Sequence, residues 1–336
     1  MIDSLLENLT QGRDLTFDDM RVVTGRIMQG GCSDEQIARL LTLLAAKGET
    51  VDEVAGAAAA MREQMTPIRT TRTGVLDTCG TGGDGSGTFN ISTAAALVVA
   101  AAGVPVAKHG NRGITSRSGS ADALAALGVN VAADVPTVEA CLDELGICFC
   151  FAPLLHQSMK QVAPIRRQLG IPTIFNLLGP LSNPARAEYQ LLGVGKARLR
   201  PLLAAALARL GVRRAAVVSG DDGLDEVTLA GGTTVTDVIG ASLSESRWTP
   251  EDFGLRSASL DPLRVAGPDE SAAMIRQVLS GMAGVARDVV VLNAAAGLWI
   301  VGRSDSPRQA AEMAAAAIDS GAAARLLAQL AKATQR

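Results

Sequence analysis

Apolar residues follow two different patterns along the chain, and the first pattern predicts a helical part. Up to about residue 70 the spacing of apolar residues is helical. Ser33 with Gln36, and Thr50 with Glu53, are two capping-box pairs that predict helix starts. Residues 1–72 are therefore predicted to form a small N-terminal α-helical domain. The clearest helical series in it is Ile37, Leu40, Leu41 and Leu44.

The second pattern begins near residue 73, where short apolar runs alternate with helical stretches. This alternation is typical of an α/β domain, and residues 73–336 are predicted to form one, with a central mixed, mainly parallel sheet. A Gly/Pro-rich passage at 170–184 reads as neither helix nor strand. It predicts a hinge segment, near 164–186, that returns to and completes the helical domain. The strand-like runs are 75–79, 104–107, 147–152, 189–194 and 215–219.

Composition narrows the class of protein. The chain has 336 residues, 48% of them hydrophobic, and a net charge of −3, which argues against an electrostatic nucleic-acid binder. The longest apolar run, 94–107, is too short to cross a membrane, and the N-terminus lacks the order of a signal peptide. Five cysteines in no zinc-like spacing suit a reduced compartment, with Cys148 and Cys150 expected as buried small hydrophobes. We expect a cytoplasmic protein with no membrane or nucleic-acid partner.

Residues 77–122 carry the strongest chemical signal. Glycines at 80, 82, 83, 85 and 87 allow the backbone N–H groups to approach an anion, and phosphate is the expected ligand. Gly80, Gly82 and Gly85 satisfy a dinucleotide-binding pattern, but Lys108 lies where the ribose-binding acid would be expected. A Walker loop fails because Ser86 replaces the lysine.

The remaining interpretation is a polyanion site built from several segments. Asn90, Ser92 and Thr93 open a predicted helix, so their hydroxyls and the first N–H groups lie at its positive end. Lys108 supplies a charge. A second helix start follows, and two anion sites suggest a ligand phosphorylated at both ends. The alternative is a flexible glycine loop with serines that only cap helices. The second group of hydroxyls is Ser116, Ser118 and Ser120.

Two further clusters suggest a metal and a carboxylate. Asp225 and Glu226 follow the apolar run 215–219, and adjacent carboxylates near a pyrophosphate are natural Mg²⁺ ligands. A solvated acidic turn is the alternative. Arg166 and Arg167 lie in a helical stretch, and an arginine can pair with a carboxylate in two hydrogen bonds. One of two adjacent arginines is usually only a surface charge.

Seven motifs together resemble the anthranilate phosphoribosyltransferase family. The resemblance extends over essentially the whole chain, including ARDVVVLNAAAGL at 286–298. GTGGD is shared with relatives such as pyrimidine nucleoside phosphorylases, whereas KHGNR followed by TIFNLLGPL is more specific. The chain departs from the family pattern at 113–115 and at Arg117, although Thr115 keeps a hydroxyl and Arg117 a charge. The motifs are GTGGD at 80–84, NIST at 90–93, KHGNR at 108–112, SGSAD at 118–122, VAPIRRQLG at 162–170, TIFNLLGPLSNPA at 173–185 and DGLDE at 222–226.

The resemblance implies transfer of the phosphoribosyl group of phosphoribosyl pyrophosphate (PRPP) to the amine of anthranilate, in a cleft between the two domains. It implies catalytic roles for Lys108, His109 and Arg166, with His109 not required as a general base because an arylamine is already uncharged. His156 is placed either on the route to the anthranilate pocket or, equally, as a packing histidine. The implied PRPP-binding residues are Gly80, Gly83, Asp84, Thr88, Asn90, Ile91, Ser92, Thr93, Lys108, Ser116 and Ser120.

The same resemblance implies the cofactor and the partners. Anthranilate is expected against Gly80, Asn111 and Arg166, and two Mg²⁺ ions per site are expected, one on Asp225 and Glu226 and one touching Ser92. A homodimer is expected through the helical domain, as is a possible association with anthranilate synthase components. Two alternatives stay open from the residues, namely a pyrimidine nucleoside phosphorylase and a non-catalytic nucleic-acid-binding paralogue of the same fold.

Overall fold

The computed structural model describes residues 2–113 and 117–335 and contains one seven-stranded sheet with the order β3-β2-β1-β4-β5-β6-β7. Neighbouring strands from β3 across to β5 run parallel, and β6 and β7 pair antiparallel to their neighbours. The predicted mixed, mainly parallel sheet is therefore confirmed. The strands are β1 (Leu76–Asp77), β2 (Val106–Gly110), β3 (Ile147–Phe151), β4 (Tyr189–Gly193), β5 (Arg214–Gly220), β6 (Thr233–Ile239) and β7 (Ser242–Trp248).

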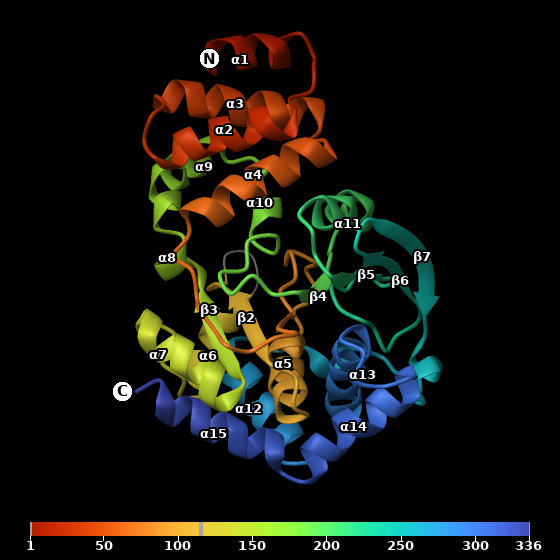
Figure 1. The fold of residues 1–336 in the computed structure, drawn as a ribbon. Coiled ribbons are helices and arrows are strands. Elements are labelled where there is room, and N and C mark those ends of the chain that lie inside the picture. The colour runs from red at the N-terminus through yellow and green to blue at the C-terminus, as the bar shows by residue number, and fades with distance from the viewer. Residues whose placement is uncertain (1, 114–116, 336) are drawn as a thin grey trace.

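The helical part lies at one end of the molecule (Figure 1). Both predicted capping boxes are present, because Ser33 and Thr50 each accept the backbone N–H three residues later. Two later helices return to this part, because α3 contacts α9 and α4 contacts α10. Helix α8 (Ala152–Leu155) leads from the sheet toward them, and its Leu155 belongs to the core of the sheet. The elements of the helical part are α1 (Ile2–Thr10), α2 (Phe17–Met28), α3 (Asp34–Lys47), α4 (Val51–Gln64), α9 (Ala163–Leu169) and α10 (Phe175–Leu178).

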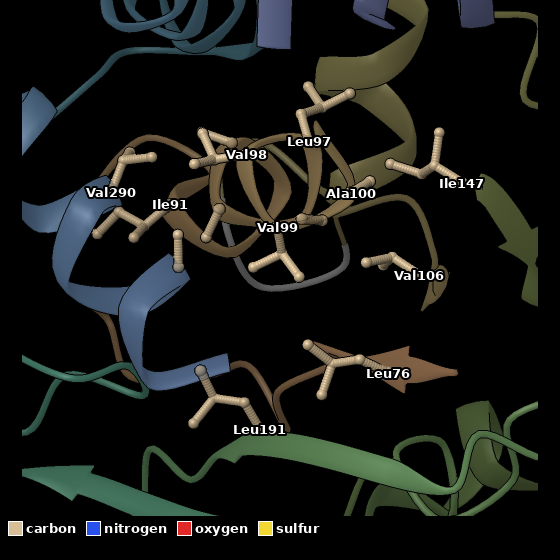
Figure 2. Packing of buried hydrophobic residues seen from close by; sticks show 14 of the residues in the cluster. Leu76, Ile91, Leu97, Val98, Val99, Ala100, Val106, Ile147, Leu191 and Val290 are labelled. Atoms are coloured by element: carbon tan, nitrogen blue, oxygen red, sulfur yellow. The ribbon is translucent and has the colours of Figure 1, made fainter. Parts of the chain in front are cut away.

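Helices cover both faces of the sheet, and the period of two along each strand divides the core between them. Ala216 and Val218 of β5 belong to the cluster that contains α5 and α13, whereas Ala215 and Val217 join α11 and the helical part. Figure 2 shows Val99 of α5 pointing toward the strands that carry Leu76 and Leu191. The helices are α5 (Ile91–Ala101), α6 (Ser120–Ala126), α7 (Val135–Ala140), α11 (Arg200–Arg209), α12 (Pro268–Leu279), α13 (Val285–Ile300), α14 (Pro307–Asp319) and α15 (Ala322–Ala333).

Two sequence interpretations need correction. The passage 170–184 contains the short helix α10, whose Phe175, Leu177 and Leu178 are buried against the helical part. The hairpin of β6 and β7 was not predicted, because its strands carry many hydroxyl and charged side chains and β7 is exposed on both faces for most of its length. Its signal was the two-residue turn after Ile239, with Gly240 at φ 56°.

Three chain segments join the helical part to the sheet, namely the linker after α4, the segment from β3 to α9 and the segment from α10 to β4. Backbone hydrogen bonds tie the first to the other two, from Thr66 N–H to the carbonyl of Leu155 and from Ile68 N–H to that of Pro184. Asp143, in the π-helical turn after α7, accepts hydrogen bonds from Thr70 and Thr71. No helix among the described residues is long and apolar enough to span a membrane. The five cysteines are free thiols, and Cys148 and Cys150 are buried as expected.

Candidate functional site

The glycine loop lies between β1 and α5 and has the backbone that its sequence demands. Gly82, Gly83, Gly85 and Gly87 have φ values of 67–79°, where a side chain would be strained. Gly82 N–H donates to the Asp225 carboxylate at 2.9 Å, so the loop and the acidic pair are in direct contact. Gly80 is confined, because a Cβ there would lie 3.2 Å from Asp225 Oδ2.

Several predicted PRPP residues lie along this loop with different exposures. Gly83 is exposed, whereas Asp84 and Thr88 are half-buried. Ile91 and Thr93 are buried, so their side chains pack inside the protein. A short antiparallel contact fixes the exit of the loop: Val265 N–H donates to the Gly87 carbonyl and Phe89 N–H to the Leu263 carbonyl, both at 2.9 Å.

Lys108, Ser92 and Glu226 form the centre of the site. Lys108 on β2 is 4% exposed, and its Nζ donates to the carbonyl and Oγ1 of Thr78 at 3.1 Å and to Ser92 Oγ at 3.2 Å. Ser92 N–H, in the first turn of α5, donates to Glu226 Oε1 at 3.0 Å. Segments more than a hundred residues apart in the chain therefore place a buried cation, a hydroxyl and a carboxylate in contact.

The acidic pair is held rigidly by its own loop and by α13. The buried Asn293 side chain accepts Val227 N–H and donates to the Val227 carbonyl, both at 2.9 Å. Burial and the nearby Asp84 raise the pKa of Asp225 to about 7. Burial and Asp225 raise the pKa of Glu226 to about 8. Crowded carboxylates of this kind repel one another, and a bound cation relieves that repulsion.

The donor set fits Mg²⁺ chemically. Two carboxylates and the Ser92 hydroxyl are the oxygen ligands that Mg²⁺ prefers, and Mg²⁺ is usually completed by substrate phosphates and water. No three His, Cys, Asp or Glu side chains converge as a metal cage in the described parts of the chain. Any Mg²⁺ here would thus share its coordination with the phosphorylated substrate.

The serine-rich segment before α6 is partly used within the protein. Ser118 Oγ donates to Asn90 Oδ1 at 2.7 Å, and Ser120 Oγ lies 3.4 Å from the Asn111 carbonyl. The carboxylate of Asp122 accepts the N–H groups of Gly113 and Gly119, so that helix start already holds an anionic group. The predicted ligand Ser116 lies outside the described residues.

The predicted acceptor residues come from both parts of the molecule. Arg166 on α9 donates to Asn176 Oδ1 at 3.1 Å, and its guanidinium lies 5.8 Å from the centre of the Phe175 ring. Burial lowers the pKa of Arg166. Asn111 is exposed at the end of β2. Within the described chain, the polar contact of Arg166 is to the hinge segment, and none joins it to Asn111 or Gly80.

His109 lies in a polar network that the sequence did not reveal. Its Nδ1–H donates to the Gly179 carbonyl at 2.9 Å, and its Nε2 lies 3.1 Å from His156 Nε2. Burial lowers the pKa of His109 to about 4 and that of His156 to about 3. Asp77 accepts the backbone N–H of His109, and Asn183 donates to Asp77. The only sequence signal for these contacts is that Asp77 and His109 lie near the ends of adjacent strands, β1 and β2.

Comparison with protein families assigns both parts of the chain. Residues 72–324 match the model described as "Glycosyl transferase family, a/b domain", and residues 3–65 match "Glycosyl transferase family, helical bundle domain". The anthranilate phosphoribosyltransferase of Pelotomaculum thermopropionicum is 50% identical over 98% of this chain and 96% of its own length. That of Anaeromyxobacter dehalogenans is 50% identical over 99% of both chains.

Solved structures agree. A crystal structure of anthranilate phosphoribosyltransferase from Thermus thermophilus superimposes with a TM-score of 0.93 at 42% identity, covering 98% of this chain and 99% of the other. The Saccharomyces cerevisiae enzyme in complex with PRPP and Mg gives a TM-score of 0.89 at 29% identity, with 99% and 98% covered. The same yeast enzyme in complex with 4-fluoroanthranilate gives 0.87 at 28%, with 100% and 99% covered.

Proposed function

This chain belongs to the anthranilate phosphoribosyltransferase family, and on that premise we propose that its reaction depends on Mg²⁺ bound by Ser92, Asp225 and Glu226. It transfers the phosphoribosyl group of PRPP to the amine of anthranilate, the second step of tryptophan biosynthesis from chorismate. The products are N-(5-phosphoribosyl)anthranilate and pyrophosphate. The proposal on Mg²⁺ rests on one observation, namely that Lys108, Ser92 and Glu226 are in direct contact beside the glycine loop.

The reaction needs charge stabilisation more than proton transfer. The lone pair of the anthranilate amine attacks the anomeric carbon, and the bond from that carbon to the pyrophosphate oxygen breaks with its electron pair. The departing pyrophosphate gains negative charge while the ribosyl carbon gains oxocarbenium character. We propose that Lys108, which contacts Ser92 in the first turn of α5, and the N–H groups of that turn stabilise this charge. Bound Mg²⁺ would add positive charge on the leaving group.

The acceptor is proposed to bind through Arg166, Asn111 and Gly80. Arg166 is half-buried against Phe175, so its guanidinium combines a charge for the carboxylate of anthranilate with an apolar surface for the arene. The attacking amine is uncharged near neutrality and loses its proton only after the new bond forms. His109 therefore needs no role as a base, and both of its ring nitrogens already have partners inside the protein.

The wider properties are proposed from the same membership. The yeast relative was solved in complex with PRPP and Mg, which supports Mg²⁺ as the cofactor, and we propose two ions per site from the family resemblance. We further propose a cytoplasmic homodimer that associates through its helical part, with possible binding to anthranilate synthase components. The division into a helical domain at 1–72, completed near 164–186, and an α/β domain at 73–336 suits a cleft that closes on both substrates and excludes water.

The test is the loss of anthranilate fluorescence when purified protein is mixed with PRPP and Mg²⁺. We expect turnover to require all three components, to stop with EDTA and to return with excess Mg²⁺. Glu226→Gln should lower kcat/KM by about 100-fold or more, since it removes a charged ligand of the leaving-group metal. The matched control is Asp221→Asn, an exposed acid in the same loop that pairs with Arg247.

Two results would contradict this account. Undiminished turnover in EDTA would remove the metal from the reaction. Equal activity of Glu226→Gln and Asp221→Asn would remove Glu226 from the site. Phosphorolysis of thymidine or uridine, measured in parallel, tests the nucleoside phosphorylase alternative, and salt-sensitive DNA binding without turnover tests the non-catalytic one.

A further inference from the structure

Asn90 joins three segments that lie far apart in the sequence. It caps the N-terminus of α5, but its side chain makes no capping bond within the helix. Instead its Oδ1 accepts hydrogen bonds from Ser118 Oγ at 2.7 Å and Ser271 Oγ at 2.8 Å. Its Nδ2 donates to the Ser118 carbonyl at 3.1 Å. The side chain of Asn90 is therefore directed inward, where it fixes the positions of its neighbours.

Ser271 contacts both the main chain and the side chain of Asn90. It lies in the first turn of α12, is 0% exposed, and accepts the backbone N–H of Asn90 at 3.0 Å while donating to the Asn90 side chain. One hydroxyl thus satisfies both the main chain and the side chain of the residue that begins α5. Without it, the Asn90 N–H would be left near no other partner in this arrangement, which is costly for a group that is largely shielded from water.

The segment just before Ser271 reinforces the same region. Leu263 and Val265 form the backbone hydrogen bonds that hold Phe89 and Gly87 at the exit of the glycine loop. Helix α12 also packs on α5 and α6, the two helices whose starts carry the predicted anion-binding segments. Residues 263–271, here called the brace, therefore contact the glycine loop, the start of α5 and, through Asn90, the segment before α6.

We propose that Ser271 is a positioning residue for PRPP binding, which acts by orienting Asn90 and so setting the distance between the two phosphate-binding segments. The inference rests on the proposed binding of PRPP at the glycine loop and the start of α5, and on the predicted binding of its second phosphate by the segment before α6, beside the Asp122 carboxylate. Ser271 itself touches no substrate group. A ligand with phosphate at both ends must span both segments in one geometry, whereas anthranilate, proposed to bind at Gly80, Asn111 and Arg166, does not reach the start of α5. The two substrates should therefore respond differently to its loss.

If Ser271 had a purely structural role, its loss would lower stability without a selective effect on PRPP. The chain offers a matched control for such a role. Thr334, the C-cap residue directly after α15, is also a buried hydroxyl that accepts a distant backbone N–H, that of Asn130 at 3.0 Å. It is not part of the brace and contacts none of the predicted binding segments. Thr334→Val and Ser271→Ala thus remove the same kind of hydrogen bond at comparable burial, one remote from the site and one beside it.

The experiment measures PRPP affinity by calorimetry with Mg²⁺ present, and KM for both substrates, in full-length wild type and both variants. We expect Ser271→Ala to raise the Kd and KM for PRPP about tenfold, the effect of one lost buried hydrogen-bond pair, with KM for anthranilate within twofold of wild type. Thr334→Val should lower the melting temperature and leave both KM values unchanged. In Ser118→Ala/Ser271→Ala the combined loss of affinity should be smaller than the product of the single effects.

The outcomes separate the two levels of inference. If the wild type neither binds PRPP nor turns over, the proposed function fails, and with it the premise of this proposal. If the wild type is active but Ser271→Ala binds PRPP as tightly, or raises KM for both substrates equally, the positioning role of Ser271 alone is wrong. If the loss of PRPP affinity in the double variant equals the product of the two single losses, the proposal is likewise wrong. Ser118 and Ser271 would then act independently and not through Asn90.

Discussion

His109 and His156 show at the level of single residues how burial decides chemistry. They are the only two histidines in the chain, and they lie against each other with ring centres 5.0 Å apart. Both imidazoles are buried, so each resists protonation, and a second positive charge beside Lys108 would be unfavourable. The pair is therefore neutral at physiological pH and contributes hydrogen bonds rather than charge.

This neutrality predicts a specific pH dependence. The pKa of His109 is lowered to about 4 and that of His156 to about 3, so the unfolded chain takes up protons first when the pH falls below the ordinary value of about 6.5. The stability contributed by the neutral pair is full above that value and declines as the pH falls toward 4. Proton NMR of the two imidazole C2–H signals should show no titration between pH 8 and 5.

The NMR result has a clear converse. A midpoint near 6.5 for either signal would mean that the imidazole is hydrated and free to act as a base. Asp77 works in the opposite direction, because burial raises its pKa to about 6, so the overall slope of stability with pH does not isolate the histidines. Comparison of wild type with His156→Gln, by urea unfolding at pH 7.5 and 5, does isolate one of them.

At the level of elements, the end of β4 meets the acidic loop with no space between them. A Cβ on Gly193 would lie 1.6 Å from the Asp225 carbonyl oxygen, which is backbone and cannot move aside alone. Gly193 also accepts Thr81 N–H through its own carbonyl at 2.9 Å. Gly193 therefore allows β4, the glycine loop and the acidic pair to lie in close contact.

Gly193→Ala should accordingly displace the acidic loop. We expect kcat/KM to fall by about 100-fold or more, because an error of about 1 Å in a positioned group is enough for such a loss. A higher Mg²⁺ concentration for half-maximal rate should accompany it. Gly231→Ala is the control, since nothing lies within 4 Å of a Cβ there. Wild-type Mg²⁺ dependence in Gly193→Ala would show that the loop tolerates the change.

The elements also show what the sequence could predict. Period and caps located α3 and α4 within the predicted helical part, although not the capping box at Thr16 that begins α2. The five mutually parallel strands were also located, since apolar runs buried on both faces have a strong local signal. The hairpin of β6 and β7 lacked that signal, because hydroxyl and charged residues dominate it. The motifs singled out Lys108, Ser92 and Glu226, which the fold brings together. They could not predict the contacts of Ser271, Asn183 and Gly179. The partners of these residues lie 70 to 181 positions away in the sequence and meet them only through folding.

At the level of the whole molecule, Asn183 fastens the hinge segment to the sheet. Its Nδ2 donates to Asp77 Oδ2 at 2.7 Å and to the Ala107 carbonyl at 2.8 Å, and its Oδ1 accepts Ala185 N–H at 2.9 Å. Asp77 is completely buried, so it depends on such donors. The hinge that returns from the helical part is thus anchored beside β1 and β2, next to Lys108 and His109.

Asn183→Leu should destabilise this joint by about 2–4 kcal/mol, because it leaves a buried carboxylate and a carbonyl short of donors. Urea unfolding followed by tryptophan fluorescence measures it, since Trp248 and Trp299 both lie in the sheet-containing part. Asn130→Ala, which loses one exposed contact to Ala132 N–H, should change stability by less than about 1 kcal/mol. Equal effects of the two substitutions would show that Asn183 anchors nothing.

The helical part is assembled from pieces separated by β1, β2 and β3, and this has a consequence for synthesis. Helices α2, α3 and α4 leave the ribosome early, but the residues that cover them, such as Ile165, Phe175 and Leu178, follow more than a hundred residues later. Helices α2 and α4 can pack on each other at once, but the apolar surface that α9 and α10 will cover stays exposed until then. During synthesis, β1, β2 and β3 therefore emerge before the residues that complete the core of the N-terminal part. That core can be completed only after much of the parallel sheet has been made.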